Sequence, residues 1–212
     1  MSADPGYRSL FRWCFVLLLI CAPACRGKGQ TAVTSSGDPK LDRMIIFAME
    51  RTRVPVTYDG RYRAIPYPGG DVPDHVGVCT DLVIRAYRAV GVDLQRLVHE
   101  DMVGAFDAYP QKWGLDGPDS NIDHRRVPNL QAFFERSGAG LAVSADAEAY
   151  KPGELVTWML PGNLPHVGIV TGMRSKDGKR YLIVHNIGAG PQIQDVLFDW
   201  PITGHYRYHP WK

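Results

Sequence analysis

Apolar residues recur at helical spacing through the first two thirds of the chain. The clearest stripe lies in residues 79–90 and is formed by Val83, Ala86, Tyr87 and Val90. This spacing of i, i+3, i+4 and i+7 puts the apolar side chains on one face, so it predicts a helix that Gly91 ends. Similar patterns predict helices over 41–52 and 128–136 and a broken helix over 93–109.

The pattern changes in the last third, where short apolar runs alternate with turn residues. Strands are predicted over 154–160, 167–173 and 181–186, and one or two edge strands over 193–208. Asp177-Gly178 is a turn signal between the second and third of these runs. Because the helices precede an antiparallel sheet, the fold class is α+β.

The N-terminus is typical of an exported protein. Arg8 and Arg12 precede an apolar run over 13–24, which is shorter than the roughly 20 residues of a membrane span. Residues 22–25 (APAC) resemble a bacterial lipoprotein box, so Cys25 is the predicted lipidation site. Plain secretion and an uncleaved anchor are the alternatives. The favoured location is the periplasmic face of a membrane, with the outer membrane preferred, and a soluble periplasmic protein is the alternative.

Composition and length constrain the rest of the chain. Residues 26–40 are polar and rich in Gly and Ser, as in a flexible tether, and residues 41–212 are long enough for one domain. The net charge of +2 gives no reason to expect nucleic-acid binding. We therefore predict a signal segment over 1–25, a tether over 26–40, and a single domain that is monomeric.

Cysteine usage singles out one thiol. Cys14, Cys21 and Cys25 fall in the signal segment or at its end, so Cys79 is left without an intramolecular partner. A buried inert cysteine is the plainer interpretation. However, Cys79 begins a predicted helix, where free N–H groups and the helix dipole stabilise a thiolate. We therefore expect Cys79 to be a nucleophile with a lowered pKa.

A thiol nucleophile needs a base, and two histidines lie on adjacent predicted strands. His166 begins the run 166–170 and His185 ends the run 182–186. The two rings meet if the strands pair with His166 directly opposite His185, which requires a long connection over much of 173–180. The catalytic interpretation requires this register. It also places the Cys79 Sγ within about 4 Å of a His166 nitrogen.

These motifs support a family resemblance. A Cys at a helix start, then His-Val-Gly-Ile-Val and Val-His-Asn, resembles the NlpC-type cysteine peptidases of the bacterial cell wall. The resemblance implies a papain-like fold, in which the Cys helix packs on a C-terminal antiparallel sheet. It also implies that Cys79 attacks, His166 is the base and His185 orients it, with no cofactor.

A closer resemblance covers nearly the whole domain. Residues 77–81 (GVCTD), 121–129 (NIDHRRVPN) and 204–208 (GHYRY) look like a bacterial family catalogued only as a domain of unknown function. That match implies no activity.

The loop around residues 119–129 supplies further candidates. Its acidic start imitates a calcium loop, but His124 and Leu130 stand where Gly and Glu are needed, so we predict no metal. Arg125 or Arg126 is a candidate to hold a substrate carboxylate, because Arg binds carboxylates bidentately. A loop fixed by salt bridges and a His-containing metal site are the alternatives. The full set of candidate substrate-binding residues is Asp81, His124, Arg125, Arg126 and Asn186.

The prediction is thus a cysteine hydrolase that cleaves an amide bond in peptidoglycan stem peptides or another envelope peptide. Its partners are that substrate and, through the lipid on Cys25, the membrane. An acyltransferase or esterase on the same fold is one alternative. A peptidoglycan-binding lipoprotein without catalytic activity is the other.

Overall fold

The computed structural model describes residues 34–211, all of which belong to one folded unit. The predicted signal segment, the lipidation site Cys25 and part of the tether fall outside these residues. Within residues 34–211, every helix is too short or too polar to cross a membrane.

Four α-helices form where the apolar stripes predict them. They are α1 (Pro39–Glu50), α2 (Cys79–Arg88), α3 (Leu94–Ala105) and α4 (Val127–Arg136). Four single-turn 3-10 helices accompany them: η1 (Arg51–Arg53), η2 (Phe106–Ala108), η3 (Asp123–Arg125) and η4 (Ala147–Ala149). The Asp38 carboxylate begins α1 by accepting the N–H groups of Lys40 and Leu41, and this cap explains why the helix starts two residues earlier than its apolar stripe.

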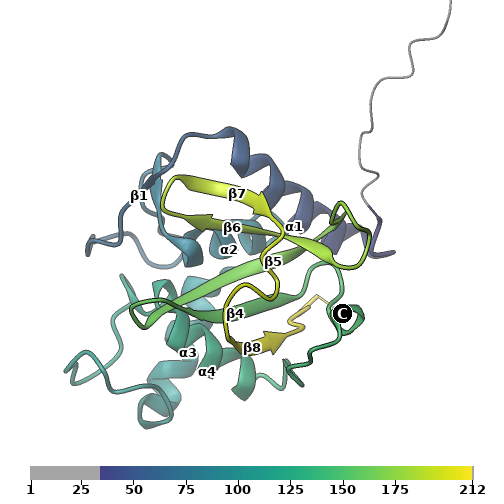
Figure 1. The fold of residues 1–212 in the computed structure, drawn as a ribbon. Coiled ribbons are helices and arrows are strands. Elements are labelled where there is room, and N and C mark those ends of the chain that lie inside the picture. The colour runs from purple at the N-terminus through teal and green to yellow at the C-terminus, as the bar shows by residue number, and fades with distance from the viewer. Residues whose placement is uncertain (1–33, 212) are drawn as a thin grey trace, which may run out of the picture. The chain divides into compact units, whose positions relative to one another are not determined.

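One antiparallel sheet of six strands follows in the chain, so the α+β class is confirmed (Figure 1). Its strands are β3 (Gly140–Leu141), β4 (Leu155–Leu160), β5 (Leu164–Arg174), β6 (Tyr181–Ile187), β7 (Gly190–Gln194) and β8 (Ile202–Tyr206). Their order across the sheet is β3-β8-β4-β5-β6-β7. A separate parallel pair consists of β1 (Thr57–Tyr58) and β2 (Val76–Gly77).

The prediction that the C-terminal strands lie at an edge is half wrong. β7 is an edge strand, but β8 lies between β3 and β4. It reaches this place because the chain returns across the sheet after β7, in front of β4 in the view of Figure 1. The two edges are therefore β7 and the two-residue strand β3, and Pro191 lies near the start of β7.

Both faces of the sheet are buried. On one face, Val167, Ile169 and Val184 pack with residues of α1, α2 and α4 in a single apolar core. On the other, Trp158 and Val170 belong to a smaller core that includes residues from 147–150 and 196–202. Because side chains alternate along a strand, consecutive residues of β5 enter different cores.

The pairing of β5 with β6 differs from the predicted register. Gly168, rather than His166, lies opposite His185, so the predicted direct pairing is wrong by two positions. The register shifts between Val170 and Arg174, where an irregularity takes up the difference before Arg174 pairs with Tyr181. The polar residues 175–180 connect the strands. Asp177-Gly178, the predicted turn signal, lies in a turn within this connection, where the Gly178 N–H donates to the Ser175 carbonyl.

Candidate functional site

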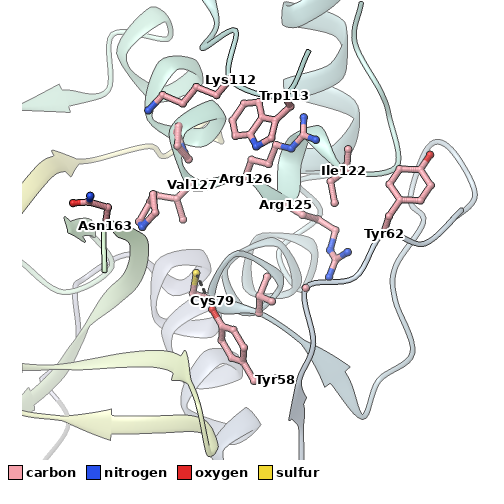
Figure 2. A pocket seen from close by; sticks show the side chains of 14 residues that line it. Tyr58, Tyr62, Cys79, Lys112, Trp113, Ile122, Arg125, Arg126, Val127 and Asn163 are labelled. Carbon is pink, nitrogen blue, oxygen red and sulfur yellow. Dashed lines mark hydrogen bonds between the residues drawn. The ribbon is translucent and has the colours of Figure 1, made fainter. Parts of the chain in front are cut away.

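A pocket of about 670 Å³ opens at the N-terminus of α2 (Figure 2). It is bounded by the β1 region, the start of α2, the loop before α4 and the β4–β5 turn. Its lining residues are Tyr58, Gly60, Tyr62, Val78, Cys79, Lys112, Trp113, Ile122, Arg125, Arg126, Val127, Pro128, Asn163 and Pro165. Three of the predicted site residues are therefore gathered in one cavity: Cys79, Arg125 and Arg126.

Cys79 is the first residue of α2, as the sequence predicts, and its side chain is buried at the pocket wall. The Tyr58 hydroxyl donates to its Sγ at 3.9 Å, and the backbone N–H groups of Val167 and Thr80 also point to the sulfur. These donors favour a thiolate, but burial outweighs them and raises the pKa of Cys79 to about 11. The expectation of a lowered pKa is therefore wrong for this state of the protein.

The site forms where β5 and β6 separate. Their pairing ends at Gly168 opposite His185, and the next residue of β5, Val167, directs its N–H to the Cys79 thiol. The next residue of β6, Asn186, donates its Nδ2 to the carbonyls of Gly77 and Val78, each at 3.2 Å. The two strands thus hold the start of α2 in the opening between them.

The two predicted histidines lie together at the same end of the strands. His166 Nε2 is 2.8 Å from His185 Nδ1, and His185 Nε2 is 2.8 Å from the Gln194 Oε1. Because the amide oxygen only accepts, His185 carries its proton on Nε2 and accepts at Nδ1 from the Nε2–H of His166. The Nδ1 of His166 is then left with a free lone pair, which is what a general base requires.

The imidazole pair and the thiol approach the sheet from different faces. His166 stands opposite Trp158 and its ring lies 6.2 Å from that of Trp200, on the side of the smaller core. The Cys79 thiol belongs to the helix-side core, and no hydrogen bond joins it to either imidazole in residues 34–211. The direct thiol–imidazole hydrogen bond expected from the sequence is therefore absent from this state.

Both imidazoles are neutral at pH 7. Burial, and then the neighbouring His185, lower the pKa of His166 to about 3, and burial lowers the pKa of His185 as well. With the thiol protonated and the base neutral, the resting site holds no ion pair. A nucleophilic attack by this thiol would therefore need proton transfer during the attack rather than before it.

Asp81 and Arg125 form a buried ion pair behind the pocket. Arg125 donates from Nε and Nη2 to the two carboxylate oxygens at 2.8 and 3.0 Å, and the Val78 N–H donates to the same carboxylate at 2.7 Å. Thr80 adds a hydrogen bond from its hydroxyl to the Arg125 carbonyl. The Asp81 carboxylate accepts three hydrogen bonds from the protein and does not line the pocket, so it positions the start of α2.

The remaining candidates divide between the pocket and the interior. His124 and Asn186 are buried and do not line the cavity. Burial, and then the charge of Arg125, lower the pKa of His124 to about 3. Arg126 does line the cavity, with its guanidinium carbon 4.0 Å from the ring centre of Trp113. In residues 34–211 no three His, Cys, Asp or Glu side chains gather as metal ligands would.

Sequence reasoning missed the other polar and aromatic groups around the thiol. Tyr58 and Tyr62 come from a turn-rich segment whose position depends on tertiary contacts, so no local pattern identifies them. Asn163 ends the short turn between β4 and β5 with a positive φ of 57°. Trp113 had a usable signal, because it is a lone large aromatic residue in the polar loop 110–128.

We predict slow alkylation of Cys79 at neutral pH. Because burial raises its pKa to about 11, the thiolate is scarce at pH 7 and the rate rises as the pH approaches that value. Iodoacetamide labelling between pH 6 and 10, followed by mass spectrometry, measures this profile. Tyr58→Phe removes a donor to the sulfur and should slow labelling further. Labelling of the native protein faster than of free cysteine at pH 6 would contradict the prediction.

Comparison with known proteins gives one family and one close relative. Residues 45–208 match the family model described as "Domain of unknown function (DUF1287)". The chain is also 54% identical over 151 residues to the uncharacterised protein YijF of Escherichia coli (strain K12), an alignment that covers 71% of this chain and 73% of YijF. The matched residues include the whole pocket lining.

Proposed function

Since the chain belongs to the DUF1287 family, whose description assigns no activity, we propose from the site itself that it is a cysteine hydrolase. Its substrate is an amide bond in a cell-envelope peptide, and peptidoglycan stem peptides are the favoured class. Cys79 is the nucleophile, His166 the base and His185 the residue that orients the base. We also propose that the fold is papain-like and NlpC-type, and the packing of α2 against β5 and β6 of the antiparallel sheet in one apolar core supports this.

One observation carries this proposal. A thiol at a helix N-terminus lies at the wall of an open pocket, and Gln194, His185 and His166 form a chain of hydrogen bonds that ends at the residue before Val167. The residue that follows His166 already directs its N–H to the sulfur. A structural role alone does not require a buried imidazole pair whose last nitrogen is left free to accept a proton.

The mechanism follows from these roles. The Cys79 Sγ attacks the amide carbonyl carbon while its proton passes to His166 Nδ1. The N–H groups at the start of α2 stabilise the negative charge that develops on the carbonyl oxygen. The protonated His166 then gives its proton to the leaving amine, and a thioester remains on Cys79. Water, deprotonated by His166, attacks the thioester and releases the carboxylic acid and the free thiol.

These steps require His166 and the thiol to come into hydrogen-bond contact. The resting state lacks that contact, and substrate binding is the event that we expect to produce it. An acyltransferase would use the same residues but pass the acyl group to an acceptor other than water. An esterase would use them with an alcohol as the leaving group. Both reactions are alternatives to amide hydrolysis at this site.

A binding protein without catalysis is the second candidate. The raised pKa of Cys79 and the absence of a hydrogen bond to His166 favour it.

In either case, we propose export and anchoring through Cys25 on the periplasmic side of a membrane, with the outer membrane favoured. Mass spectrometry of the purified N-terminus tests the anchor.

The deciding experiment is digestion of peptidoglycan fragments by the purified protein, analysed by mass spectrometry. We expect new amine and carboxylate ends from the wild-type protein and none from Cys79→Ala, because no other described residue replaces the sulfur. If the Cys79→Ala protein still binds the fragments, its loss of cleavage comes from the missing thiol and not from failed substrate binding. Identical products from both proteins, or binding without any cleavage, would reject the hydrolase and favour the second candidate.

A further inference from the structure

The pocket carries a positive charge that the catalytic residues do not explain. Lys112, Arg125 and Arg126 line it, and no Asp or Glu does. Figure 2 shows them on the walls around Cys79, together with the ring of Trp113. A cavity with cationic and aromatic walls favours an anionic ligand.

The two arginines are not equivalent. Arg125 is almost fully buried, and Asp81 already holds its guanidinium through two hydrogen bonds. Its charge is therefore compensated within the protein. This removes Arg125 from the two candidates for a substrate carboxylate.

Arg126 keeps most of its binding capacity. Its one ion contact in the described chain is a single long one, from Nη1 to the Asp123 carboxylate at 3.5 Å. Its guanidinium carbon lies over the Trp113 ring, and this cation–π contact holds the group at the pocket wall without using its N–H donors. Lys112 also lines the pocket, is exposed, and makes no ion pair within residues 34–211.

We propose that Arg126, supported by Trp113 and assisted by Lys112, binds a free carboxylate of the peptide whose amide bond Cys79 attacks. This inference rests on the proposed function for the identity of the substrate. It narrows the substrate class to peptides that carry an unblocked carboxylate close to the cleaved bond. Peptides whose carboxylates are amidated are then poor ligands.

Binding to the Cys79→Ala protein tests the proposal without turnover. The probes are a synthetic peptidoglycan stem peptide with its carboxylates free and the same peptide with them amidated, compared by isothermal titration calorimetry. We expect the free peptide to bind at least about tenfold more tightly, as for a charge-assisted bidentate pair. Added to Cys79→Ala, Arg126→Gln should remove this difference and Arg126→Lys should restore part of it. Arg96→Gln, on the surface of α3, should leave it unchanged.

The outcomes separate this inference from the proposed function. Equal binding of the two peptides overturns the carboxylate site, even if the wild-type protein cleaves both. Selective binding without cleavage by the wild-type protein keeps the carboxylate site and rejects the hydrolase. If Arg126→Gln does not fold, Lys112→Gln and Trp113→Leu replace it, and unchanged selectivity in both contradicts the proposal.

Discussion

Replacing His166 by glutamine is expected to lower the rate of amide hydrolysis by about 10²- to 10⁴-fold, the usual contribution of a general base. Glutamine keeps a polar group beside His185 but cannot take up the thiol proton. The loss should appear in kcat more than in KM, because His166 does not line the pocket that binds the peptide. Initial rates of fragment release by mass spectrometry measure both constants.

His205 provides a matched control for this variant. It is also a buried histidine of the sheet, but its Nε2 bonds to Glu154 at 2.6 Å, within the protein interior. His205→Gln is expected to lower stability while the folded fraction keeps its kcat. A His166→Gln protein with the wild-type rate would remove His166 from the mechanism, whatever the fate of Cys79.

The largest loss of stability is expected from Asp81→Asn. This change leaves the guanidinium of Arg125 buried without a counter-charge, which costs about 3–5 kcal/mol when one partner of a buried pair is removed. Urea unfolding followed by circular dichroism measures the free energy of unfolding. The double variant Asp81→Asn/Arg125→Gln should recover part of the loss, because no unpaired charge then remains.

Asp101→Asn is the matched control for this experiment. Asp101 also pairs with an arginine, Arg136, but the side chains are 30% and 37% exposed. Water screens such a pair, so the expected loss is about 0–1 kcal/mol. Equal losses for Asp81→Asn and Asp101→Asn would show that the buried pair does not hold the start of α2 in place.

The helices and most strands follow from local patterns, but the face of the sheet that each side chain occupies does not. In α2 one face is apolar, so periodicity predicts both the helix and the burial of Val83 and Tyr87. In β5 both His166 and Val167 are buried, so the polar–apolar alternation that would assign the faces is missing. The sequence therefore predicts a thiol and two histidines at one end of the sheet, without the direction from which each approaches.

The register of β5 and β6 could not be predicted from the sequence for a related reason. The register shifts between Val170 and Arg174, and the polar connection after Arg174 fits several loop lengths equally well. The distinction between Arg125 and Arg126 also needed the fold. It depends on Asp81, which is 44 residues away from Arg125 in the chain.

The two edges of the sheet bear on how the protein behaves when it is concentrated. An exposed strand edge with free N–H and C=O groups is a template on which other chains add strands and aggregate. Here one edge is the two-residue strand β3, which offers little length for pairing. The other is β7, where Pro191 lacks an N–H to donate. Molecules at high concentration would thus meet edges that resist the growth of intermolecular sheets.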